Sequence, residues 1–268
     1  MIEQIQDSFV SDLALAHRLA DMADKYALSF FQTNFSPILK QDGTPVTRID
    51  FEIEQKMKTI LSKERPDDAI LGEEFGLTKQ ANRCWILDPI DGTSEYIAGK
   101  KYWGTHIALE ENDELILGLI SRPALNRRWW ATKGKGAYHA KSFDLDEPLP
   151  VNLSLSKHLS QSKIAIWERV QTKRVEKFQD MSVWIPPSLK NMIEFLDGEI
   201  DAFVDVIGKP WDHAPVAIIV EEAGGTFQDS QGGRRIDLGE VRYTNGKIDT
   251  EFFRILTHFQ DLEEKHLF

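Results

Sequence analysis

The spacing of hydrophobic residues predicts two long helices in the first quarter of the chain. From residue 9 to residue 31, apolar side chains recur at three- and four-residue steps, which is the period of a helix with one buried face. A second apolar stripe runs to about Lys63, and either Thr47 or Asp50 is placed to cap the start of that helix. We therefore expect two amphipathic helices before residue 64.

Short apolar runs separated by turn residues predict a sheet in the middle of the chain. The runs cover residues 69–71, 84–87, 104–109, 114–121 and 128–131. The last three are joined by Asn112-Asp113 and by residues 123–126, and strands spaced so closely form an antiparallel meander. Residues 144–150 are polar and contain proline, so we expect a connection there.

The second half of the chain alternates between strand and helix patterns. Residues 164–166 and 201–206 are predicted strands, and residues 188–198 and 215–223 are predicted helices. This alternation favours an α/β unit. We therefore predict two domains. The first covers residues 1–145, with the helices and the antiparallel sheet, and the second covers residues 146–268.

Composition narrows the class of protein. The 268 residues include 32 basic and 43 acidic side chains, a net charge of −11, which argues against a general nucleic-acid binder. The single cysteine, Cys84, rules out an intrachain disulfide and fits a reducing compartment. The N-terminal segment is too charged for a signal peptide, and no apolar run reaches the roughly 20 residues of a membrane span. We expect a cytoplasmic protein that does not bind membranes.

The densest chemical feature is the hexapeptide that runs from Asp88 to Thr93. It sets Asp88 and Asp91 three residues apart where a strand gives way to a helix. A helix that begins after Gly92 directs the amides of Gly92, Thr93 and Ser94 toward an anion. Mg²⁺ takes oxygen ligands and bridges carboxylates to phosphate oxygens. The alternative is a capped helix start with two solvated aspartates.

Three further acids are ambiguous when each is taken alone. Glu73 and Glu74 follow a predicted strand, where adjacent acids are ordinarily solvated. Asp212 precedes an apolar helix, where aspartate is a common cap. The seven histidines show no spacing typical of metal ligands, so zinc is not expected.

Taken together, these segments resemble the inositol monophosphatase superfamily of Mg²⁺-dependent, lithium-sensitive phosphatases, over about residues 10–247. The matching stretches are Gly72-Glu73-Glu74, the run from Trp85 to Thr93, and Trp211-Asp212 followed by residues 222–225. Within the superfamily, the stretches at residues 44–50, 71–76 and 123–131 resemble those of histidinol-phosphatases.

The resemblance implies a multi-layer α/β sandwich (αβαβα) of the α+β class, with two or three Mg²⁺ ions in an active site between the two halves and Asp212 supplied by the second. By this resemblance, Glu73, Asp88 and the Ile90 carbonyl hold one ion. Asp88, Asp91 and Asp212 hold another, and Glu73 reaches a third through water.

The resemblance also assigns roles in catalysis and substrate binding. Asp50 and the Thr93 hydroxyl orient the attacking water, with Glu73 counted among the catalytic residues. Gly92, Thr93 and Ser94 bind the phosphate, and Asp205 contacts the alcohol part of the substrate. The family further implies a homodimer.

The expected reaction is Mg²⁺-dependent hydrolysis of a small phosphate monoester, L-histidinol phosphate in particular, as in histidine biosynthesis. The alternatives are an inositol-1-phosphate or broad sugar-phosphate phosphatase, then a nucleotide 3′-phosphatase, then a catalytically silent binding protein. Two segments depart from the family pattern: Glu95 beside the phosphate helix, and the short stretch from Trp184 to Ser188.

Overall fold

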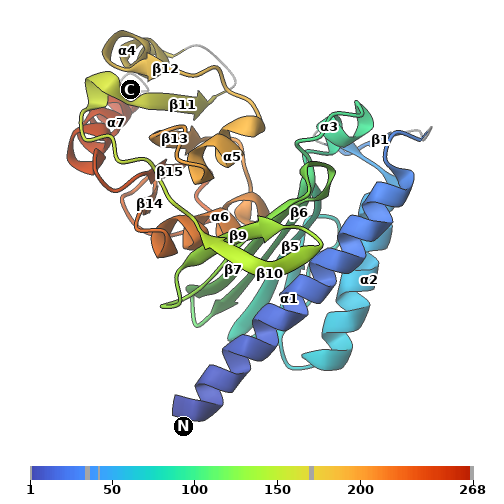
Figure 1. Ribbon diagram of the computed structural model, residues 1–268. Coiled ribbons are helices and arrows are strands. Elements are labelled where there is room, and N and C mark those ends of the chain that lie inside the picture. The colour runs from blue at the N-terminus through green and yellow to red at the C-terminus, as the bar shows by residue number, and fades with distance from the viewer. Residues whose placement is uncertain (1, 34–36, 42, 169–171, 266–268) are drawn as a thin grey trace. The chain divides into compact units, whose positions relative to one another are not determined.

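The computed structural model describes residues 2–33, 37–41, 43–168 and 172–265 (Figure 1). The chain divides into two compact units. The first unit is Met1–Pro150 together with Pro210–Glu222, and the second is Val151–Lys209 together with Ala223–Phe268. The second unit therefore begins close to the predicted boundary at residue 146, but the helix that carries Asp212 belongs to the first unit.

An eight-stranded sheet forms the centre of the first unit, in the order β10-β9-β8-β7-β6-β5-β3-β4. Its pairs are antiparallel except for β3 with β5, which is parallel. The strands are β3 (Ala69–Gly72), β4 (Gly76–Leu77), β5 (Arg83–Asp91), β6 (Gly104–Glu111), β7 (Glu114–Arg122), β8 (Arg127–Thr132), β9 (Ala137–Lys141) and β10 (Asp144–Pro150). A small pair, β1 (Ile38–Leu39) with β2 (Pro45–Val46), lies outside this sheet.

The expectation of a loop at residues 144–150 is wrong, because this segment forms strand β10. It pairs with β9 at the edge of the sheet, and its register shifts between Asp144 and Leu149. Proline and charged residues are tolerated on edge strands, where one side of the backbone needs no partner.

Two helices, α1 (Ile2–Phe30) and α2 (Arg48–Glu64), pack against one face of this sheet (Figure 1). The Thr47 side chain caps α2, and Asp50 bonds back to the Thr47 amide, so both residues proposed for the cap take part in one capping box. The core beneath the helices is apolar and includes Trp85, Leu87 and Ile107.

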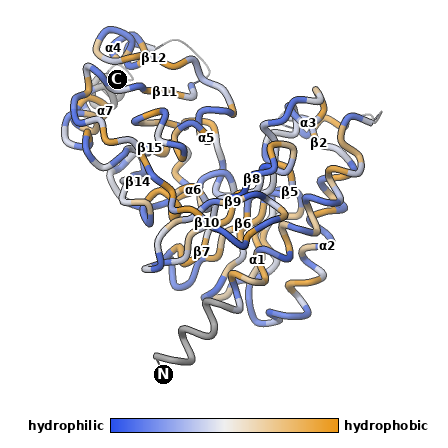
Figure 2. The backbone as a smooth tube through the Cα atoms, in the orientation of Figure 1, coloured by the Kyte–Doolittle hydropathy of each residue, from blue (hydrophilic) through white to orange (hydrophobic). Residues whose placement is uncertain are grey.

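Helix α6 (Pro210–Glu222) packs on β5, β6, β7 and β8, and its apolar residues from Val216 to Val220 are all buried. Figure 2 shows hydrophobic residues along α6 and the central strands. The helix approaches β7 so closely that a Cβ atom on Gly118 would lie 2.7 Å from the Pro215 carbonyl oxygen. The middle of this helix is apolar on every side, so it is buried in the first unit. In the chain, however, the helix lies between two segments of the second unit. It also begins earlier than the predicted residue 215.

The second unit contains a five-stranded mixed sheet in the order β12-β11-β13-β15-β14. Its elements are β11 (Lys163–Trp167), α4 (Lys173–Met181), β12 (Val183–Trp184), α5 (Lys190–Leu196), β13 (Ala202–Asp205), β14 (Thr226–Asp229), β15 (Val241–Thr244) and α7 (Asp249–Lys265). Helices and mixed sheets together confirm the predicted α+β class. Among the described residues, no helix is long and apolar enough to cross a membrane.

Candidate active site

A β-bulge brings Asp88 and Asp91 to the same side of the sheet. Side chains three residues apart on a regular strand point to opposite faces. In β5, however, Asp88 pairs with His106 while Asp91 pairs with Gly104, so three steps on β5 match two on β6. The Thr105 hydroxyl lies 3.0 Å from the Pro89 carbonyl oxygen within the bulge. The bulge therefore directs both carboxylates toward one site.

Asp88 lies at the centre of this site and carries the strongest sign that the site suits a cation. Its side chain is buried, and its Oδ1 atom has no hydrogen-bond partner among the described residues. Burial, followed by the negative charges of Glu73, Asp91 and Asp212, raises the pKa of Asp88 well above its ordinary value. A divalent cation would satisfy the oxygen and remove the repulsion, so these residues fit a bound metal ion.

A group of three side chains offers ligand atoms that lie within 4.8 Å of one another: Asp91, His106 and Asp212. Asp212 is in the first turn of α6, rather than just before a helix as the sequence suggested. His106 was not predicted, because its strand carries no histidine spacing typical of a metal site. The pairing of β5 with β6 reveals it, since residues directly opposite in a sheet project to the same side.

Arg122 makes a buried ion pair with this group. Its Nη2 atom lies 2.6 Å from Asp91 Oδ2 and 3.0 Å from His106 Nε2. Burial alone raises the pKa of Asp91, but the Arg122 guanidinium and His106 outweigh it and hold that pKa below its ordinary value. Burial lowers the pKa of His106 to about 4, so the imidazole is neutral near pH 7.

The turn after β3 presents Glu73 and is held by two further residues. Glu54 on α2 accepts hydrogen bonds from the amides of Glu74 and Phe75 at 2.8 and 3.1 Å. Lys40 Nζ lies 2.6 Å from Glu73 Oε1 and 2.8 Å from Glu74 Oε1. Sequence reasoning missed both Glu54 and Lys40, because neither belongs to a recognisable motif.

Asp50 and Thr93 come together at the start of α3 (Thr93–Ile97). The Thr93 hydroxyl lies 3.0 Å from Asp50 Oδ1 and 3.1 Å from the Ile90 carbonyl oxygen. Gly92 precedes the helix with φ of 80°, a left-handed conformation that glycine adopts readily. The amides of Glu95 and Tyr96 are the first in the helix to reach a backbone acceptor, the Gly92 carbonyl. The amides before them, including that of Ser94, lie at the exposed end of the helix.

The remaining predicted residues have different positions. Asp205 ends β13 in the second unit, where its Oδ1 accepts bonds from the Ile207 and Gly208 amides at 2.9 Å. Glu95 pairs with Lys100 at 2.8 Å. The segment from Trp184 to Ser188 begins in β12 of the second unit. The substrate contact assigned to Asp205 stays a prediction.

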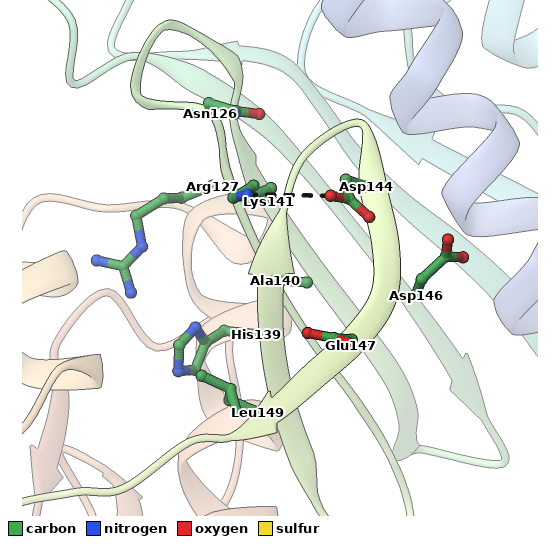
Figure 3. Close-up of a pocket in the computed structure, with 9 residues that line it drawn as sticks. All are labelled: Asn126, Arg127, His139, Ala140, Lys141, Asp144, Asp146, Glu147 and Leu149. Carbon is green, nitrogen blue, oxygen red and sulfur yellow. Dashed lines mark ion pairs between the residues drawn. The ribbon is translucent and has the colours of Figure 1, made fainter.

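A pocket of about 700 Å³ lies at the opposite end of the first sheet, along β8, β9 and β10 (Figure 3). Its lining includes Asp144, Asp146, Glu147 and Arg127, and it contains none of the residues predicted for catalysis. Lys141 Nζ lies 3.9 Å from Asp144 Oδ2 there. The carboxylate cluster on β3, β5, β6 and α6 therefore remains the candidate active site.

Known proteins share this fold and much of the sequence. The profile of the inositol monophosphatase family matches residues 11–262. A histidinol-phosphatase from Streptomyces coelicolor is 35% identical over 261 residues, which cover 92% of this chain and 97% of that protein. A Streptomyces griseus protein named glucose-1-phosphate thymidylyltransferase is 40% identical over 231 residues, covering 85% and 89%. The IMPase of Thermotoga maritima superposes with a TM-score of 0.81 at 26% identity, covering 94% and 98%.

The fold and these relatives define a phosphoric monoester hydrolase. Two other histidinol-phosphatases, from Mycobacterium tuberculosis and Chlorobaculum parvum, are 35% and 34% identical, so the predicted resemblance to that subgroup is confirmed. The chain belongs to the inositol monophosphatase family. Enzymes of this family use divalent metals, and the group formed by Asp91, His106 and Asp212 is compatible with that use.

Proposed function

We propose that the chain hydrolyses a small phosphate monoester with the aid of Mg²⁺, and that L-histidinol phosphate is its substrate. The observation that carries the proposal is the buried Asp88 oxygen without a hydrogen-bond partner among the described residues, surrounded by Glu73, Asp91 and Asp212. An all-oxygen ligand set of this kind suits Mg²⁺. Glu73, Asp88 and the Ile90 carbonyl hold the ion, and Asp91 and Asp212 offer further oxygens.

When bound, divalent cations polarise the phosphoryl oxygens and make hydroxide available near neutral pH. The protein's own part is to bind the phosphate and orient the attacking water. The backbone amides of Gly92, Thr93 and Ser94 bind the phosphate oxygens. Asp50 and the Thr93 hydroxyl, which are 3.0 Å apart, orient the water. Burial raises the pKa of Asp50, which suits a carboxylate that accepts a proton.

The choice of substrate rests on the relatives. Histidinol-phosphatases match nearly the whole chain at about 35% identity. L-histidinol phosphate carries an ammonium and an imidazole group, and Asp205 supplies a negative charge for its alcohol part. The inositol and fructose bisphosphate phosphatases that also match make a sugar phosphate the second candidate. By the family resemblance we also propose a homodimer, which size-exclusion chromatography with light scattering tests.

The test is phosphate release in Mg²⁺ from four compounds at equal concentration: L-histidinol phosphate, inositol-1-phosphate, fructose-1,6-bisphosphate and glucose-1-phosphate. A parallel reaction with glucose-1-phosphate and dTTP measures nucleotidyl transfer, the activity named for the Streptomyces griseus relative. We expect kcat/KM for histidinol phosphate to exceed the others by about 100-fold, which is about 2.7 kcal/mol at the transition state.

Each other outcome has a distinct meaning. Preference for a sugar phosphate would retain the metal site and mechanism but reject the proposed substrate. Phosphate release that persists in excess EDTA would contradict the role of the metal. No release from any compound, with dTTP consumed instead, would overturn the hydrolase proposal.

A further inference from the structure

Arg122 reaches the carboxylate cluster across a strand, through a space that a glycine provides. Arg122 ends β7 and Asp91 ends β5, and β6 lies between them. Gly104 on β6 is the register partner of Asp91. A Cβ atom on Gly104 would lie 2.8 Å from Arg122 Nη1 and 2.9 Å from Arg122 Cδ, as well as 1.8 Å from the Ser121 carbonyl oxygen. Any larger residue at position 104 would obstruct the arginine side chain.

The guanidinium occupies two of the atoms that a metal ion shared by Asp91 and His106 would use. Arg122 Nη2 donates to Asp91 Oδ2 at 2.6 Å and faces His106 Nε2 at 3.0 Å. A guanidinium has only donors and no lone pair to offer, so His106 accepts at Nε2. His106 Nε2 then has no lone pair left for a cation, and at Asp91 the positive charge of the guanidinium lies directly on Oδ2. The Arg122 side chain is 0% exposed, so the charge that it brings to the site is fully buried.

Arg122 is held by the site rather than by a structural network. Within the described part of the chain, its Nε and Nη1 atoms have no hydrogen-bond partner. Arg128, on the neighbouring strand and equally buried, differs: its ion pairs join Asp21 and Asp24 on α1, at 2.9 and 2.7 Å. The partners of Arg122 thus belong to the group that is compatible with a metal.

We propose that Arg122 is a built-in cation of the active site, which takes the place of one divalent ion at Asp91 and His106. The centre therefore binds one divalent ion fewer than the same centre without this arginine. Glu73 and Asp88 keep their oxygens and hold the ion that remains. This inference rests on the proposed metal-dependent function and specifies the composition of its site.

The test counts metal ions without any substrate. Mn²⁺ binding is measured by isothermal titration calorimetry and by electron paramagnetic resonance for the wild type and for Arg122→Met, Arg122→Lys and Arg128→Met. We expect Arg122→Met to bind one more Mn²⁺ per chain than the wild type. Arg122→Lys keeps the positive charge, and Arg128→Met removes an equally buried arginine elsewhere, so both should bind as the wild type does.

The wild type alone supplies a second measurement, in case Arg122→Met does not fold. Two Mn²⁺ ions bridged by Asp88 would give an exchange-coupled spectrum, whereas we expect the signal of isolated ions at saturation. Equal stoichiometry in wild type and Arg122→Met, or a coupled pair in the wild type, overturns the role of Arg122 while leaving the metal-dependent function intact. No Mn²⁺ bound to any of the proteins overturns both proposals.

Discussion

Gly118 on β7 controls how closely α6 approaches the sheet, and therefore where Asp212 lies. An alanine Cβ at this position would lie 2.5 Å from Ile218 Cγ2, 2.7 Å from the Pro215 carbonyl oxygen and 2.9 Å from Pro215 Cα. The last two atoms belong to the helix backbone, so a new rotamer of Ile218 cannot relieve the overlap. Gly118→Ala must move the helix.

The size of the movement follows from these distances. Ordinary contact begins at 3.4 Å, so the Pro215 carbonyl must retreat by about 0.7 Å, the difference from 2.7 Å. Overpacking of this kind costs about 1–3 kcal/mol of stability. Asp212 lies three residues before Pro215 and moves with it, which changes its distances to Asp91 and His106. A misplacement near 1 Å at a catalytic group can cost about 100-fold in rate, so we expect kcat/KM to fall about 10- to 100-fold.

The assay compares Mg²⁺ dependence and thermal unfolding in Gly118→Ala and a control, Gly232→Ala. Gly232 has a φ of 80°, and a Cβ atom added there would meet nothing within 4 Å, so alanine costs about 1–2 kcal/mol of backbone strain without touching α6. The control should lose stability but keep its Mg²⁺ dependence. The double variant Gly118→Ala with Ile218→Ala should not recover activity. Wild-type turnover and Mg²⁺ affinity in Gly118→Ala would refute the argument.

Three further predictions concern other side chains. Asp88→Asn should lower turnover at least about 100-fold, as expected for loss of a preorganised electrostatic group. The same variant should have a higher Tm in EDTA, because it removes like-charge repulsion among the carboxylates. Unchanged turnover in saturating Mg²⁺ would contradict the role of Asp88 as a metal ligand. Burial raises the pKa of Cys84 to about 11 from 9.0, so iodoacetamide at pH 7.5 should alkylate it about 100-fold more slowly than a free thiol, as mass spectrometry can measure. Burial and the nearby Arg128 lower the pKa of His17 to about 4. As the pH falls below 6.5, His17 is protonated in the unfolded chain but not in the folded one, so the free energy of unfolding should decrease between pH 6.5 and pH 4. His17→Gln should make the urea midpoints less dependent on pH over this range.

The elements that sequence alone could predict are those with strong local signals. The three- and four-residue period of α1 and α2 and the turn at Asn112-Asp113 depend on neighbours in the chain, and the structure confirms them. Strand β10 has no such signal, because it is stabilised by pairing with β9. Helix α6 shows a related limit: its apolar sequence indicates burial, but only Gly118 opposite Pro215 shows which unit it is buried in.

The site divides in the same way. Asp88 and Asp91 lie in one hexapeptide, so their proximity could be expected, although the bulge that turns both to one face could not. His106 and Arg122 enter through strand register, at positions 15 and 31 residues after Asp91. Register depends on the whole sheet, and a motif search along the chain does not detect it.

The positive charges around the cluster are arranged unevenly. Lys40 pairs with Glu73 on one side, and Arg122 pairs with Asp91 on the other. Asp88 lies between them without a protein cation of its own among the described residues. The two flanking cations differ in freedom, because the Lys40 side chain is 22% exposed and that of Arg122 is 0% exposed. If a divalent ion binds Glu73 and Asp88 as proposed, the partly exposed lysine can turn toward solvent, whereas the arginine is fully buried. Under the proposed function, the site at Glu73 and Asp88 would therefore exchange its cation, whereas the positive charge beside Asp91 would stay with the protein.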